Sequence, residues 1–110
     1  MTREELLDEM ERIGKQRGRA RFYYMKPHGQ VCVLGAAALA LGVPKSTLRT
    51  ASSSPMSIGD KVLEGKAHRA AYEIGEAIKP YWSRLTMAIA QTQGDTSGWK
   101  SAMNYLRNHA

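Results

Sequence analysis

The sequence contains little cysteine and no long hydrophobic run. Cys32 is its only cysteine, so the chain cannot form an internal disulfide, and we expect a reducing environment. The longest uncharged apolar segment, Val31 to Val43, is well short of the roughly 20 residues that span a bilayer. The first residues are acidic and helical in pattern, unlike a secretion signal. We therefore expect a single soluble domain over residues 1–110, located in the cytoplasm, with no membrane partner.

The sequence also lacks the side-chain sets that metal sites and nucleophilic sites need. Cys32 and the histidines His28, His68 and His109 are scattered, without the paired spacing of zinc ligands. Cys32 beside a histidine could serve as a nucleophile, but its apolar neighbours favour a buried core residue. The segment "LGAAALALG" has neither the lysine nor the glycine spacing of a phosphate-binding loop. We expect a protein that is not an enzyme, with no catalytic residues, no metal ligands and no cofactor.

Positive charge is the first functional feature. The chain has 16 Lys and Arg residues against 10 acidic residues, a formal net charge of +6. Six of these cations lie between Arg12 and Lys26 with no acid among them, interleaved with aromatic residues. Such a strip can neutralise phosphates and stack on bases, or it can simply be the solvated end of a helix with the turn that follows. The candidate nucleic-acid or partner surface in this strip is Arg17, Arg19, Arg21, Tyr23 and Lys26.

The first elements are read from capping and turn signals. Thr2 and Glu5 form a capping box, which predicts a helix from Arg3 to Lys15 that ends near Gly18. Aromatic and β-branched residues on both sides of "KPHG" predict a β-hairpin, Arg21–Met25 against Gln30–Val33. The predicted fold class is α+β, mainly α-helical, with an N-terminal helix, one hairpin and about four further helices.

Helical signals dominate after the hairpin. An Ala-rich helix is closed by Gly42, Pro44 opens a short helix, and an apolar stripe predicts a long helix from Asp60 that stops before Pro80. A weaker helix follows over Tyr81–Ala90, then a "GDTSG" loop in which Thr96 caps the terminal helix. The periodicity predicts these core residues: Val31, Val33, Leu34, Ala38, Leu41, Leu63, Ala67, Ala70, Ile74 and Trp99.

The stretch "AAALALGVPKSTLRT", residues 36–50, has the spacing of a helix-turn-helix motif. Ala38, Gly42, Val43 and Leu48 stand where that motif has its small residue, turn glycine and two apolar contacts. The residues that would then face a DNA groove are Lys45, Ser46, Thr47 and Arg49. The preceding hairpin, the short second helix and the "SSSP" break favour the alternative, a simple corner between two helices, which needs the same glycine.

The segment "GQVCVLGAAALALG" resembles a segment of small uncharacterised proteins from actinobacteriophages and their actinobacterial hosts. The shared pattern corresponds here to Gly29, Val31, Cys32, Leu34, Gly35 and Ala36. The likeness covers roughly Leu6 to Gly42 in the order of elements. It implies a phage-type accessory protein that acts in the host cytoplasm by binding a host macromolecule and modulating host physiology. A host protein is the first expected partner. The alternative is DNA, bound through Lys45 to Arg49 and the strip from Arg12 to Lys26.

Overall fold

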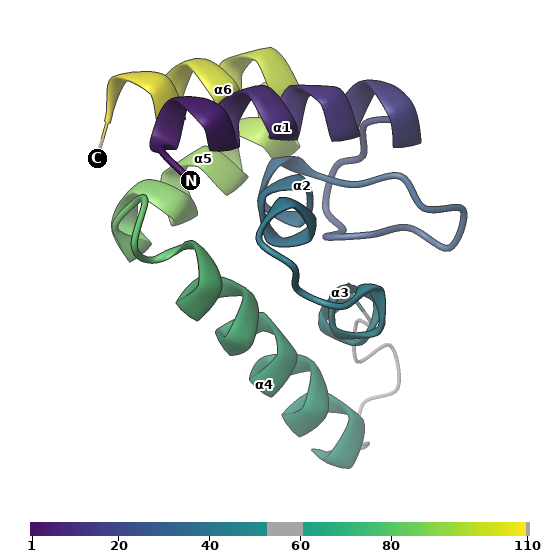
Figure 1. The fold of residues 1–110 in the computed structure, drawn as a ribbon. Coiled ribbons are helices and arrows are strands. Elements are labelled where there is room, and N and C mark those ends of the chain that lie inside the picture. The colour runs from purple at the N-terminus through teal and green to yellow at the C-terminus, as the bar shows by residue number, and fades with distance from the viewer. Residues whose placement is uncertain (53–60, 110) are drawn as a thin grey trace.

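Helices make up most of the part of the chain that the computed structural model describes, residues 1–52 and 61–109, with the side chains of residues 61–64 excepted. Figure 1 shows α1 and α6 side by side above α2 and α5, with α4 running obliquely below them and α3 beside it. None of these helices is both long and apolar enough to cross a membrane. The helices are α1 (Arg3–Arg17), α2 (Val33–Ala40), α3 (Lys45–Ser52), α4 (Lys61–Ile78), α5 (Arg84–Ser97) and α6 (Trp99–Asn108).

The predicted β-hairpin is wrong, and the fold class is therefore all-α rather than α+β. In the described residues, the segment between α1 and α2 makes two isolated bridges, Arg19 with Val31 and Met25 with Val31, and no strand pair. The turn itself is present, because the Gly29 N–H donates to the Lys26 carbonyl at 2.8 Å. The sequence thus indicated the turn correctly but not the strands on either side of it.

Three constraints prevent the strands from extending. Val33 already belongs to α2, and the Cys32 Sγ atom accepts the Gly35 N–H at 3.4 Å as the helix N-cap, so the second strand stops at Val31. On the other side, Phe22 has φ +71°, which interrupts an extended backbone. The Met25 N–H donates to Ser52 Oγ at 3.1 Å instead of to a neighbouring strand.

The helix boundaries follow the sequence signals except near α5. The Thr2–Glu5 capping box opens α1 as predicted, and Gly18 ends it with φ +95°. The predicted "GDTSG" loop is wrong, because α5 continues to Ser97 and Thr96 donates its hydroxyl back to the Thr92 carbonyl at 2.8 Å instead of capping α6. Gly98, with φ +101°, separates the two helices.

The core surrounds α2, which packs against α1, α4 and α5. Every residue from Val33 to Ala38 is buried. Among the predicted core residues, Leu41 is only partly buried and the Leu63 side chain lies outside the described residues. The other predicted core residues are buried: Val31, Val33, Leu34, Ala38, Ala67, Ala70, Ile74 and Trp99.

Gly35 permits the closest backbone approach at α2. A Cβ atom at this position would lie 2.0 Å from the Tyr24 carbonyl oxygen, a distance that no real contact reaches. The Tyr24 backbone can therefore pass over the first turn of α2 only because Gly35 has no side chain. The glycine in "LGAAALALG" thus allows the loop from Gly18 to Cys32 to lie against the helix.

We predict that Gly35→Ala lowers the free energy of unfolding by about 2 to 3 kcal/mol, because the new methyl group must displace backbone atoms. Gly65→Ala is the matched control, since Gly65 lies in α4 with nothing within 4 Å of its added Cβ atom. This control should stabilise the protein by roughly 0.5 to 1 kcal/mol through helix propensity. Chemical denaturation measures both changes. Equal effects of the two substitutions would contradict the close packing at Gly35.

Candidate functional site

The turn between α2 and α3 has the hydrogen bonding of a Schellman motif. The Val43 N–H donates to the Ala38 carbonyl at 2.9 Å, and the Gly42 N–H donates to the Leu39 carbonyl at 3.1 Å. Gly42 has φ +88°, which an L residue rarely adopts. The Leu48 N–H then donates to the Pro44 carbonyl at 3.3 Å, so α3 begins directly after the turn. Gly42 therefore fixes the direction in which α3 leaves α2.

One buried leucine determines which face of α3 is exposed. Leu48 is fully buried among the core residues, and its neighbours on that side of the helix are partly buried. Lys45, Ser46 and Arg49 are exposed, whereas Thr47 is half-buried. These polar residues consequently lie on the outer side of the helix that follows the turn.

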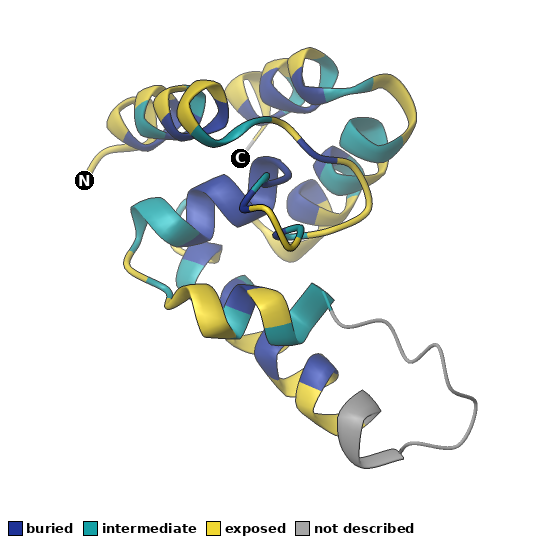
Figure 2. Cartoon of the chain, turned by 90° about the vertical axis from the view of Figure 1, so that its right-hand side faces the viewer, coloured by how far each residue is buried: buried dark blue, intermediate teal, exposed yellow. Residues whose placement is uncertain are grey.

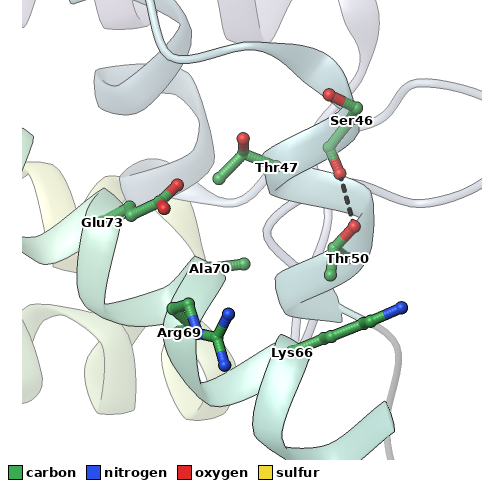
Figure 3. Close-up of a pocket in the computed structure, with 7 residues that line it drawn as sticks. All are labelled: Ser46, Thr47, Thr50, Lys66, Arg69, Ala70 and Glu73. Carbon is green, nitrogen blue, oxygen red and sulfur yellow. Dashed lines mark hydrogen bonds between the residues drawn. The ribbon is translucent and has the colours of Figure 1, made fainter. Parts of the chain in front are cut away.

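Helix α4 supplies a second wall that the sequence did not predict. Ser46, Thr47 and Thr50 face Lys66 and Arg69 across a groove of about 220 Å³ between α3 and α4. In Figure 3 the Arg69 side chain extends into the space between the two helices, and a hydrogen bond of 2.8 Å joins the Thr50 hydroxyl to the Ser46 carbonyl. The groove thus combines two hydroxyl-bearing residues from the predicted surface with two cations from α4.

The charge of this surface is largely uncompensated. Within the described residues, no acid forms an ion pair with Lys45, Arg49, Lys66 or Arg69. Glu73 is the acid that lines the groove, and in Figure 3 it lies on the α4 side, one helical turn beyond Arg69. Cations without an ion pair among the described residues, beside the exposed Ser46, favour a polyanionic partner.

The basic strip from Arg12 to Lys26 does not form one continuous surface. Arg12 pairs with Glu9 one turn earlier on α1, and this hydrogen bond holds the pKa of Glu9 below its ordinary value. Arg19 pairs with Glu11 at 3.1 Å. Acids that precede the strip in sequence therefore pair with cations inside it, Glu9 through helical spacing and Glu11 across the chain reversal after α1.

The remaining strip residues separate into two places. The Lys26 ammonium lies 5.9 Å from the centre of the exposed Tyr23 ring, and Arg17 is partly buried beside Gly29. Arg21 is exposed and lies instead beside Gly98, where α5 meets α6. The strip is thus divided between the loop and the start of α6.

Cys32 is enclosed in the core. Burial raises the pKa of its thiol to about 11, and the N–H groups of the α2 helix start only partly oppose this shift. His28 and His68 are exposed, so neither lies in the buried environment of the Cys32 thiol. In the described part of the chain, no group of three or more His, Cys, Asp or Glu residues is close enough to hold a metal ion.

Phe22 is a strained and exposed aromatic residue that sequence reasoning did not single out. It is 72% exposed, and it is the one non-glycine residue with positive φ among those described. Its N–H donates to Asp95 Oδ1 at 2.9 Å, which ties the loop to the end of α5. This long-range bond supports a conformation that costs roughly 1 to 2 kcal/mol for an L residue.

No family model, curated protein or solved structure matches the chain. The likeness to the actinobacteriophage family therefore stays a prediction.

We predict that Phe22→Gly leaves stability unchanged or raises the free energy of unfolding by up to about 1 kcal/mol, because glycine adopts positive φ without strain. Tyr23→Gly is the control, since Tyr23 is exposed in the same loop without positive φ. It should destabilise the protein by about 0.5 to 1 kcal/mol. Thermal unfolding of the two variants measures the difference. A larger loss for Phe22→Gly than for Tyr23→Gly would argue against strain.

We also predict that a thiol reagent at neutral pH modifies Cys32 slowly in the folded protein and rapidly after denaturation, because the buried thiol stays protonated. A variant with Cys32→Ala and Asn104→Cys supplies an exposed thiol on α6 for comparison. The absorbance of the leaving group that the reagent releases gives the rate of each reaction. Equally fast reaction of both folded proteins would contradict the burial of Cys32.

Proposed function

We propose that this chain is a non-enzymatic DNA-binding protein in which α3 enters the major groove. The observation that carries the proposal is the exposed polar face of α3, directed outward by the Gly42 turn and the buried Leu48. In helix-turn-helix proteins, the second helix presents its N-terminal residues to the base edges. Lys45, Ser46 and Arg49 occupy the corresponding positions here.

Direct packing of α1 on α2 supports this function over a simple corner. The hairpin expected before α2 was one of three objections to a helix-turn-helix, because that motif normally follows a packed helix. The hairpin does not form, and α1 lies against α2 instead. The bridging loop between them lies to the side of α2, on the right in Figure 1, so α1 takes the place that the motif requires.

The chemistry of the α3 face favours DNA over the host protein that the sequence put first. Protein interfaces have an apolar core, whereas DNA-binding surfaces are polar and positively charged. Within the described residues, the exposed large hydrophobic side chains are Met1, Phe22, Tyr23, Tyr72 and Leu85, and none of them belongs to α3. Lys66 and Arg69 add positive charge beside it. Phosphates on either side of a major groove are suitable partners for these two cations.

The test is a duplex-binding measurement on Lys45→Ala with Arg49→Ala. Both side chains are exposed, so the melting temperature should remain nearly unchanged. We expect the double variant to bind duplex DNA more weakly, by about 1 to 3 kcal/mol for each side chain that had bound a base edge. Fluorescence anisotropy over a series of salt concentrations measures the affinity. The slope of log K against log salt should become shallower by roughly one unit for each substituted cation that had bound a phosphate.

The matched control is Lys79→Ala with Arg107→Ala, which removes the same charge at the ends of α4 and α6. These ends lie on the side of the molecule away from α3 (Figure 1). The control should retain the affinity of the original protein. Equal losses of affinity in the two double variants, or no duplex binding at low salt, would overturn the proposal and return a protein partner to first place.

A further inference from the structure

A second cationic hollow lies where the loop after α1 meets the start of α6. The cavity has a volume of about 340 Å³, and its wall includes Arg19, Arg21, Trp99 and Lys100. Three cationic side chains thus come together from two segments almost 80 residues apart. Among the described residues that line it, none is acidic.

The cations of this hollow are held in place by different contacts. Arg19 is paired with Glu11 at 3.1 Å, and its guanidinium lies 5.4 Å from the centre of the Trp99 ring. Arg21 lies against Gly98, where a Cβ atom would be 3.1 Å from Arg21 Nη2. In the described part of the chain, neither Arg21 nor Lys100 has an acidic partner. Arg19 is therefore ordered and compensated, whereas the other two charges are available to a ligand.

The backbone at the start of α6 adds hydrogen-bond donors to these side chains. Gly98 is the N-cap of α6 and has no side chain to accept a hydrogen bond from the first turn. The first bond along the helix is from the Ala102 N–H to the Gly98 carbonyl at 3.3 Å. The N–H groups of the residues between them have no acceptor within the helix. Because Gly98, Trp99 and Lys100 line the hollow, these N–H groups lie near it and favour an anion there beside the cationic side chains.

We propose that this hollow binds a phosphate group. The cavity and its uncompensated cations carry the proposal, and the α6 N–H groups complete the coordination of the oxygens. Guanidinium and ammonium groups are the side chains that most often bind phosphate oxygens in proteins. The phosphate could belong to a nucleic-acid backbone or to a free phosphate compound, and the two sources share the same recognition chemistry.

Its position links the hollow to the α3 surface. The loop that carries Arg19 and Arg21 and the helix α3 both lie on the right in Figure 1, so both face the viewer in Figure 2. A backbone phosphate of a bound duplex would therefore meet a site on the same side of the molecule. This choice of source rests on the proposed function, but binding of a free phosphate does not.

The first experiment titrates the protein with inorganic phosphate while two-dimensional NMR follows its amide signals. We expect saturable shifts for Gly98, Trp99, Lys100 and the Trp99 indole N–H, and no saturable shifts with sodium chloride at the same ionic strength. Arg21→Gln with Lys100→Gln should weaken phosphate binding by about tenfold or more, because the two substitutions remove two charged hydrogen-bond donors. The control, Lys79→Gln with Arg107→Gln, should bind as the original protein does.

A second NMR titration replaces inorganic phosphate with duplex DNA. Shifts of the same amides identify a backbone phosphodiester as the ligand, whereas a response to inorganic phosphate alone identifies a free phosphate compound. The α3 variant Lys45→Ala with Arg49→Ala should keep its response to inorganic phosphate even if it no longer binds DNA, which separates the two proposals. The hollow is no phosphate site if these amides respond to neither probe, or if the Arg21 and Lys100 substitutions leave the response unchanged.

Discussion

The indole of Trp99 joins α6 to two segments far away in sequence, α1 and the loop that follows it. Its ring packs on α1 at Gly14, where an added Cβ atom would lie 2.6 Å from the ring, and its Nε1 atom donates to the Val31 carbonyl at 3.2 Å. Arg19 covers the ring from the loop. Because Trp99 is also the first residue of α6, this one side chain fixes the start of α6 against both α1 and the loop. The cationic hollow lies where the loop meets the start of α6, beside this indole.

The small residues in and after α2 determine both how closely other segments pack around this helix and where α3 lies. Alanine and glycine make α2 thin enough for α1, α4, α5 and the loop to pack around it. The Tyr24 backbone passes over Gly35, and the Gly42 turn directs the chain into α3. Since α2 is buried along most of its length, its direction is determined by the core, and the direction of α3 follows from it.

Local signals in the sequence predicted the elements whose causes are local. The Thr2–Glu5 box, the Gly42 stop and the apolar stripe of α4 each act within one or two turns, and the structure contains all three. The hairpin failed because long-range contacts decide its strands: Ser52 takes the Met25 N–H, and Asp95 takes the Phe22 N–H. Nothing within the segment itself signals these acceptors.

The candidate sites show the same division. The outward face of α3 could be predicted from the helical position of Leu48, whereas Lys66, Arg69 and Lys100 could not, because they reach their sites from α4 and α6. The pairing of Arg12 with Glu9 is different, since the two are three residues apart on one helix and spacing alone could have revealed it. A cation that is neutralised by an acid on its own helix adds little to a positively charged surface.

This distinction between paired and unpaired cations also explains where a net charge of +6 can act. Arg12, Arg19 and Arg84 have acidic partners and are partly neutralised within the fold. The described cations around α3 and at the start of α6 have none, so their fields extend into solvent. An approaching polyanion is attracted to the net charge over a distance of about 10 Å at moderate salt, the range set by screening. At closer range it meets the unpaired cations, whose positions are set by the Gly42 turn and by Trp99. If the proposed function holds, net charge governs the rate of encounter, while helix packing governs where the phosphates would bind.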